Sequence, residues 1–493
     1  MKIGDVSFYG LFPVIAFTVS MCVFTMVRSL VRTKYSFHRI LGATLTIVVA
    51  TLVALVEALR WRQFDTKRLS TKDFTTLSGF VNTDRLTAIS IVVICLLVII
   101  ATLVSVTYLK ERDDIPAAEF FILLQCVAVG MCAMVMANDL MAMFVALEVF
   151  SIPLYVLTAF DRRRVRSLEG GFKYFILGAV SSAIFLYGIA LHYGVSGSTA
   201  FTAATEVSTV ASISTVLILI GLLFKVAAVP FHFWSPDAYQ GAPSPVTLFM
   251  SAATKLVAFV ALVRLVQSQV IDVTVSGASA RIVLTVVCIA SALFGSIVAL
   301  RQGNIKRAIA YSSITHTAYI LLALKGGTDE SLQAVLTYVV IYAFIVAGTF
   351  AVISVVSGVN EQTDSLSQFK GLARTNPWLA GSLTVLLFAQ AGIPLTSGFI
   401  AKFDVFRVAF QEKFYLTGIV ILVATVIAAA FYIRIVLALY ADSFHDENVN
   451  SETEAPSKYI VSVQTSIAIG ICVAVTIAVG ILPSLVTGLT HAL

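Results

Sequence analysis

Long apolar stretches return at short intervals along the whole sequence, and they constrain the fold more than any other feature. Each holds roughly 20 residues or more, the number that a helix needs to cross a bilayer core about 30 Å thick. Of the 493 residues, 59% are hydrophobic and only 12% are charged, whereas soluble chains carry about 25% charged residues. We therefore expect an all-α integral membrane protein with about fourteen transmembrane helices. The stretches lie at about 9–31, 40–60, 85–109, 118–137, 139–160, 171–193, 212–230, 245–267, 281–300, 305–325, 331–358, 378–411, 414–441 and 459–489.

The basic residues predict how these helices are oriented, because cytoplasmic loops of membrane proteins carry an excess of lysine and arginine. Loop 161–173 has five such residues and loop 194–211 has none, so we expect the former in the cytoplasm and the latter outside. Loop 301–307 falls on the same side as 161–173, which places both termini outside. Loop 61–84 would then be external although it holds Arg62, Lys67, Arg68 and Lys72. The topology of the first three helices therefore stays open.

Composition also argues against several partners and sites. The net charge of +6 could suggest nucleic acid, but the basic residues form short clusters between apolar runs, so no nucleic-acid partner is expected. A lone Lys2 before the first apolar stretch and basic residues after it predict a retained helix rather than a cleaved signal peptide. The six cysteines lie inside predicted spans without a C-x-x-C pair. We therefore expect no iron–sulfur cluster, no metal and no cofactor on this chain.

Proline interrupts two of the predicted spans in similar surroundings. Pro230 lies in L-L-F-K-V-A-A-V-P-F-H and Pro394 in L-L-F-A-Q-A-G-I-P-L-T. Proline removes a backbone donor, and unsatisfied backbone at membrane depth is tolerated only inside protein or beside a water-filled cavity. Paired broken helices predict an internal repeat with transport sites near the bilayer midplane. The expected organisation is three helices in 1–110, inverted five-helix repeats in 118–267 and 281–441, and one helix in 459–493.

Four charged residues fall inside predicted spans, where each costs roughly 2.5 to 3.5 kcal/mol and usually marks a functional pathway. At about 1.5 Å per residue, Glu148 and Lys255 lie roughly 14 to 15 Å into their helices, and Lys225 roughly 20 Å. Lys402 follows the second helix break. Their depth near the bilayer midplane predicts a route for charge across the membrane.

Lysine suits such a route because burial can lower its pKa from about 10.4 by roughly 3 to 5 units, which lets it release a proton near neutral pH. Movement of Glu148 toward or away from Lys225 would load or unload that lysine. A shift of three units corresponds to about 4 kcal/mol, and moving one charge across 100 mV takes about 2.3 kcal/mol. The alternative is that the two residues form a static buried ion pair that holds helices together.

Two histidines are candidate relays because histidine titrates near neutral pH. His232 follows the break at Pro230, and His316 lies in Y-S-S-I-T-H-T-A-Y. Each could instead be an ordinary buried hydrogen-bonding residue. Lys402 could extend toward the membrane surface, and Glu57, one turn from Arg60, is expected at the membrane interface.

The segment F-K-V-A-A-V-P-F-H-F-W-S-P-D-A-Y-Q-G-A-P-S-P-V (224–246) resembles the signature stretch of the antiporter-like proton-channel subunits of respiratory complex I. Three further stretches are similar to the subunit N branch of this family. Subunit M has a glutamate where this chain has the lysine that follows G-F-I-A. The three stretches are S-A-A-T-K-L-V-A-F (251–259), N-I-K-R-A-I-A-Y-S-S-I-T-H-T-A-Y (304–319) and G-I-P-L-T-S-G-F-I-A-K-F (392–403).

The resemblance covers about 110–440 and implies a proton-translocating subunit of NADH:quinone oxidoreductase in a bacterial inner (plasma) membrane. It implies neighbours of the K, M, L, A and J types and the surrounding lipid bilayer. Quinone and NADH would be used by the complex, without a cofactor on this chain. Asp404 has no counterpart in the pattern; it could be a counter-ion for Lys402 or face a loop. The family residues that match are the fifth-helix glutamate, Glu148, and the lysines of the seventh, eighth and twelfth helices, Lys225, Lys255 and Lys402.

Three other functions remain open from the sequence. A cation/proton antiporter shares this fold, but a hard cation such as sodium should want several oxygen ligands, and beyond Glu148 the deep spans offer few. A hydrogenase-linked membrane subunit is another member of the same structural class. A purely structural anchor would leave pumping unchanged after loss of Lys225. The leading hypothesis is a proton channel driven by quinone reduction elsewhere in the complex.

Overall fold

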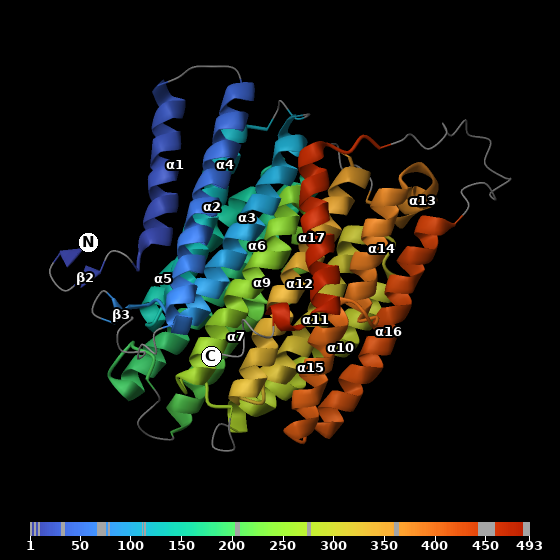
Figure 1. Ribbon diagram of the computed structural model, residues 1–493. Helices are drawn as coiled ribbons and strands as arrows, with labels where there is room; N and C mark the ends of the chain where they lie inside the picture. The colour runs from blue at the N-terminus through green and yellow to red at the C-terminus, as the bar shows by residue number, and fades with distance from the viewer. Residues whose placement is uncertain are drawn as a thin grey trace.

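The computed structural model describes residues 2–3, 6–7, 10–30, 35–66, 75–76, 79–110, 112, 115–202, 208–273, 278–358, 364–441 and 459–486, and Figure 1 shows that helices make up most of them. The N-terminal part contains three helices and two pairs of two-residue antiparallel strands, which the sequence had not predicted. Its elements are β1 (Lys2–Ile3), β2 (Val6–Ser7), α1 (Phe12–Leu30), α2 (Tyr35–Thr66), β3 (Thr75–Thr76), β4 (Val81–Asn82) and α3 (Arg85–Lys110).

The rest of the chain follows the expected order of long helices with shifted ends, and it also contains short helices at 234–241, 366–369 and 372–375 that were not predicted. Several helices begin at a side-chain cap, such as Asp139, which accepts from the backbone N–H groups of Met141 and Ala142 and so satisfies donors that a helix start leaves free. The elements are α4 (Ala117–Met136), α5 (Leu140–Thr158), α6 (Val165–Ser196), α7 (Thr209–Lys225), α8 (Trp234–Gly241), α9 (Ser244–Gln267), α10 (Ala278–Arg301), α11 (Ile305–Leu324), α12 (Asp329–Val356), η2 (Leu366–Phe369), α13 (Leu372–Thr375), α14 (Pro377–Ala391), α15 (Ser397–Gln411), α16 (Tyr415–Tyr440) and α17 (Val463–Ile481).

Eleven helices of the described chain are long and apolar enough to cross a membrane, and α7 and α14 are shorter apolar helices. The all-α membrane architecture is therefore confirmed, while the number fourteen stays a prediction. Both expected interruptions are present: turns at 226–233 separate α7 from α8, and 392–396 separates α14 from α15. The side chains of the basic residues in loop 61–84 are not among those that the structure describes. Residues 487–493, the last seven of the expected segment 459–493, also lie outside the described residues.

Two helices form the centre of the bundle. Within their apolar windows, 100% of the residues of α9 and 89% of those of α12 are buried, against 22% for α1. These two helices pack against each other, and α3 and α17 also pack on this pair. In Figure 1 the helices run side by side, with α1 and α2 toward one end of the molecule and α16 toward the other. The deep charged residues on α9 are therefore enclosed by protein rather than by lipid.

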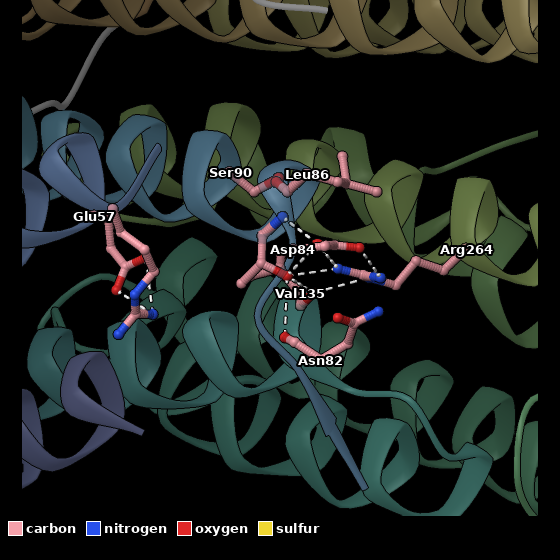
Figure 2. Close-up of polar contacts among 9 residues, drawn as sticks. Glu57, Asn82, Asp84, Leu86, Ser90, Val135 and Arg264 are labelled. Atoms are coloured by element: carbon pink, nitrogen blue, oxygen red, sulfur yellow. Dashed lines mark hydrogen bonds and ion pairs between the residues drawn. The ribbon is translucent and has the colours of Figure 1, made fainter. Parts of the chain in front are cut away.

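An arginine at the end of α9 joins three helices (Figure 2). The Arg264 guanidinium donates to both carboxylate oxygens of Asp84, at 3.0 and 2.8 Å, and to the carbonyl of Val135 at 3.0 Å. Asp84 also accepts from the backbone N–H of Thr87, so it caps α3. Burial raises the pKa of the Asp84 carboxyl, but the Arg264 charge and the hydrogen bonds outweigh it and hold the pKa below its ordinary value. This bidentate pair fixes the end of α9 against α3 and α4.

A second ion pair in Figure 2 shows the surroundings of Glu57, whose expected position at the membrane interface stays a prediction. Its side chain on α2 is fully buried, and its carboxylate lies 2.9 Å from the Arg60 guanidinium. A buried, paired carboxylate one turn from its partner is a local structural element. Glu57 is therefore enclosed in the protein rather than facing the surface.

We predict that Asp84→Asn lowers the free energy of unfolding by about 2 kcal/mol at pH 7, since the Arg264 guanidinium loses a charged acceptor. Because the folded-state pKa of Asp84 is lowered, its contribution is complete above about pH 5 and is lost as the pH falls below about 4, through that lowered pKa. Thermal unfolding of the purified assembly at several pH values measures this. The matched control is Asp329→Asn, an exposed acid at the start of α12; an equal loss in that variant would contradict the prediction.

Candidate functional site

The predicted charged residues lie in a series of polar contact groups in the interior between α5 and α15, joined partly by hydrogen bonds and partly only as neighbours along one helix. Lys225, Lys255, Lys402 and His316 are all buried, and Glu148 is half-buried. The lysines are held mainly by hydroxyls, aromatic rings and backbone carbonyls. The series begins at α5.

The ammonium group of Lys225, the last residue of α7, sits among aromatic rings. It donates to the hydroxyls of Ser151 and Tyr155 at 2.8 and 3.1 Å. Its nitrogen lies between 5.3 and 5.8 Å from four ring centroids, where a cation is attracted by the ring faces. These rings belong to Phe150, Tyr155, Tyr174 and Phe224.

Glu148 does not form the static ion pair with Lys225 that the sequence left open. Among the described residues its carboxylate accepts from the Ser182 hydroxyl of α6. Ser151, which binds the Lys225 ammonium, lies one turn further along α5. The Glu148 carboxylate and the Lys225 ammonium therefore make no direct contact, and the ammonium of α7 binds a hydroxyl on the turn of α5 that follows Glu148.

The end of α7 explains how the break is accommodated. The N–H of Ala228 donates to the carbonyl of Leu223 at 3.0 Å, and Ala227 between them has φ +56°, which is the pattern of a Schellman C-cap. The next helical acceptor, the carbonyl of Val226, would need an N–H from residue 230. Pro230 has none. The Thr317 hydroxyl of α11 replaces it and donates to the Val226 carbonyl at 2.7 Å.

Lys255 reaches the same hydroxyl from α9. Its ammonium donates to Thr317 Oγ1 at 2.7 Å and to the carbonyl of Ser313. The nitrogen also lies 5.2 Å from the ring centroid of Tyr342. Thr317 therefore bridges Lys255 and the backbone that directly follows Lys225.

His316, the neighbour of Thr317 on α11, lies between two tyrosine hydroxyls. Its Nδ1 is 2.7 Å from the hydroxyl of Tyr338 and its Nε2 is 3.0 Å from that of Tyr432. The Tyr432 hydroxyl also bonds to Ser312, and Ser312 donates to the side-chain oxygen of Gln390 at 3.4 Å. The imidazole is thus part of a hydrogen-bonded chain that reaches the second broken helix.

Lys402 closes the series by capping that helix. Its ammonium donates to the carbonyls of Gln390 and Ala391 at 2.8 and 2.9 Å, and it lies 4.9 Å from the ring centroid of Tyr319. In a continuous helix the carbonyl of Gln390 would need the N–H of residue 394, which is Pro394. A cation at the C-terminus of α14 is also favoured by the helix dipole. Lys402 therefore points into the protein and does not extend to the surface.

Two residues lie away from this series. The centroid of the buried His232 ring lies 4.6 Å from that of Phe294, and within the described residues no hydrogen bond joins His232 to the lysines. Asp404 lies 3.6 Å from the guanidinium of Arg407, so the possible ion pair with Lys402 is not formed. Of the two histidines predicted as relays, only His316 contacts other residues of the series.

Sequence reasoning missed the neutral groups that connect the charges. Tyr155, Tyr338 and Tyr432 each place a hydroxyl on a lysine or histidine of the series. They look like ordinary apolar-helix residues, and only the three-dimensional packing brings them together. One signal was available: a proline at position i leaves the carbonyl at i−4 without its donor, which identifies Val226 and Gln390 as groups needing partners.

The arrangement can store and pass protons. It offers ammonium groups and an imidazole, which titrate, linked in part by hydroxyls that can donate and accept at once. The described residues contain no group of three or more histidine, cysteine, aspartate or glutamate side chains that could hold a metal ion.

The chain is similar to known proteins over most of its length. A family model described as NADH:quinone oxidoreductase/Mrp antiporter, TM, matches residues 137–428, more than half of the chain. NADH-quinone oxidoreductase subunit N of Rhodococcus opacus is 41% identical over 362 residues, which cover 72% of this chain and 65%, just under two thirds, of that protein. For NADH-quinone oxidoreductase subunit N 3 of Streptomyces griseus the identity is 41%, covering 76% of this chain and 69% of that one. A chain in respiratory complex I from Thermus thermophilus with bound aureothin is 28% identical with a TM-score of 0.80, covering 97% of this chain and 98% of its own.

The second helix break yields a test of its packing. A Cβ at Gly398 would lie 1.7 Å from the carbonyl oxygen of Ala389, so Gly398→Ala should separate α15 from α14 and move Lys402 off its carbonyls. We predict that this variant loses most of the assembled protein, with a destabilisation of about 3 kcal/mol or more from overpacking. Quantitative native gels of membranes measure assembly. Gly381→Ala, in open space on α14, is the control and should assemble normally; normal assembly of Gly398→Ala would refute the close contact.

Proposed function

This chain belongs to the NADH-quinone oxidoreductase subunit N family, whose complex couples quinone reduction to proton pumping, and we propose that it carries protons across the membrane along the line from Glu148 to Lys402. The observation that carries the proposal is the series of contacts through Lys225, Lys255 and His316, buried in the bundle. Other complex I subunits are its expected partners, and the chain is a multi-pass membrane protein.

The contacts support the proposed order of groups. The Val226 carbonyl, next to Lys225, is bound by Thr317, which also holds Lys255. His316 follows on α11 and is linked through Tyr432, Ser312 and the Gln390 side chain to the helix end that Lys402 caps. Each ammonium is held by neutral groups. Such surroundings stabilise the charged lysine without a permanent counter-charge, so the proton can be gained and lost during a cycle.

Glu148 is the proposed input of this line. It lies at a half-buried position beside Val145, Val149 and Ile152 of α5, which expose 54%, 39% and 54% of their surface on this chain. A neighbouring membrane-arm subunit on this face could shift the Glu148 charge, and that shift would change the proton affinity of Lys225 through space. A change of about 2.3 kcal/mol at Lys225 equals the work of moving one charge across 100 mV.

The redox chemistry would lie in other subunits. We propose that this chain binds no cofactor, that quinone and NADH are used elsewhere in the complex, and that residues 118–267 and 281–441 form the two inverted proton half-channels. The neighbours would be the K-, M-, L-, A- and J-type subunits in a bacterial plasma membrane. At both breaks a side chain binds the carbonyl four residues before the proline: Thr317 at the first and Lys402 at the second. This shared arrangement supports two related halves.

We predict that Lys225→Ala in the intact complex lowers quinone-driven proton pumping by about tenfold or more, the effect of raising the barrier of one obligatory step by about 1.4 kcal/mol. Proton uptake and release per electron in vesicles measure this, normalised to assembled complex. Lys370→Ala is the matched control, because Lys370 is an exposed lysine away from the line, and it should pump normally. Wild-type stoichiometry in Lys225→Ala would show that the chain is a structural anchor.

A further inference from the structure

The hydroxyl of Thr317 joins Lys255 of the proposed proton line to the Val226 carbonyl at the first helix break. We propose that Thr317 is a positioning residue that transmits the protonation state of Lys255 to the break of α7, directly beside Lys225. The inference rests on the proposed proton path and goes beyond it, because it assigns the coupling between two carriers to a single hydroxyl.

When Lys255 is charged, the numbers of donors and acceptors fix the hydrogen bonds of Thr317. A lysine ammonium has three donors and no acceptor, whereas a threonine hydroxyl has one donor. With Lys255 charged, Thr317 must accept from it, at 2.7 Å, and its own hydrogen is free for a carbonyl. The nearer carbonyl is that of Val226 at 2.7 Å; that of Ser313, at 3.1 Å, already accepts from Lys255.

When Lys255 is neutral, its hydrogen bond with Thr317 can reverse. When Lys255 has passed one proton along the line toward His316, the resulting amine carries a lone pair and becomes an acceptor. The Thr317 hydroxyl, already at hydrogen-bond distance from that nitrogen, can rotate and donate to it. The number of protons on Thr317 is unchanged, but the carbonyl of Val226 loses its donor.

The loss of the donor to the Val226 carbonyl affects the end of α7. Val226 cannot regain a helical partner, because the residue four positions on is Pro230. A buried carbonyl without a donor is unfavourable. Whenever Lys255 is neutral, a different backbone arrangement of the turn after Lys225 is therefore favoured. Val226 is the residue directly after Lys225, so such a shift changes the position of the Lys225 ammonium within its ring of aromatic side chains. Protonation of one lysine thereby biases the other.

The test compares variants of this one side chain in the intact complex. Thr317→Val keeps the branched shape and removes the hydroxyl, and Thr317→Ala is a second hydroxyl-free variant with no added bulk. Both should lower pumping per electron by at least about fivefold, the lower end of usual coupling between sites. Thr317→Ser restores the hydroxyl and should keep most of the pumping.

The matched control is Thr315→Val, on the same helix and equally buried, whose hydroxyl makes only a contact within α11; it should pump normally. In a Lys255→Met background, Thr317→Val should cause no further loss, because Thr317 acts through Lys255. All values are normalised to assembled complex on native gels.

The outcomes separate this inference from the proposed function. Wild-type pumping in Lys255→Met would overturn the path itself. If Lys255→Met fails to pump while Thr317→Val pumps normally, the path stands and the role of Thr317 is refuted. Equal losses in Thr317→Ser and Thr317→Val, or an equal loss in Thr315→Val, would also refute it by showing that packing alone matters.

Discussion

At each of the two helix breaks, the backbone carbonyl four residues before a proline lacks its helical donor, and the rest of the site depends on how it is satisfied. Pro230 and Pro394 each remove the N–H that the carbonyl four residues earlier would need. A buried carbonyl without a partner costs about 1 to 3 kcal/mol. At the first break the donor is the Thr317 hydroxyl, and at the second it is the Lys402 ammonium. Both breaks thus draw a polar side chain into an apolar interior.

The charges in the structure fall into two kinds. Asp84 with Arg264 and Glu57 with Arg60 are direct ion pairs away from the line, and they hold helices in place. The lysines of the line contact hydroxyls, carbonyls and ring faces, and within the described part of the chain no ion pair joins them to a carboxylate. A fixed counter-ion would favour one charge state strongly. Neutral partners leave a smaller free-energy difference between the states, which is what a proton carrier needs.

The sequence alone was sufficient for the class of fold, the two helix breaks and the buried charges, because these follow from hydropathy, proline chemistry and the cost of charge in a membrane. Pro230 marked its break, and Lys402 was correctly expected close to the second one. The sequence could not give the partners. His232 and His316 looked alike along the chain, yet packing places only His316 between tyrosine hydroxyls. The lack of direct contact between Glu148 and Lys225, and the pairing of Asp404 with Arg407, depend on side-chain directions that no pattern encodes.

The enclosure of α9 has a consequence for biosynthesis. This helix carries Lys255 and Arg264, and its neighbours in the bundle include α3, which is made earlier, and α11 and α12, which are made later. During translation, α9 therefore leaves the ribosome before the groups that bind the Lys255 ammonium exist. Until α11 and α12 have been inserted, the Lys255 ammonium lacks these partners, at a cost inside the membrane, whereas Asp84 and Val135, which bind Arg264, have already been made. The most deeply buried helix of the bundle is thus made before the side chains that bind its lysine.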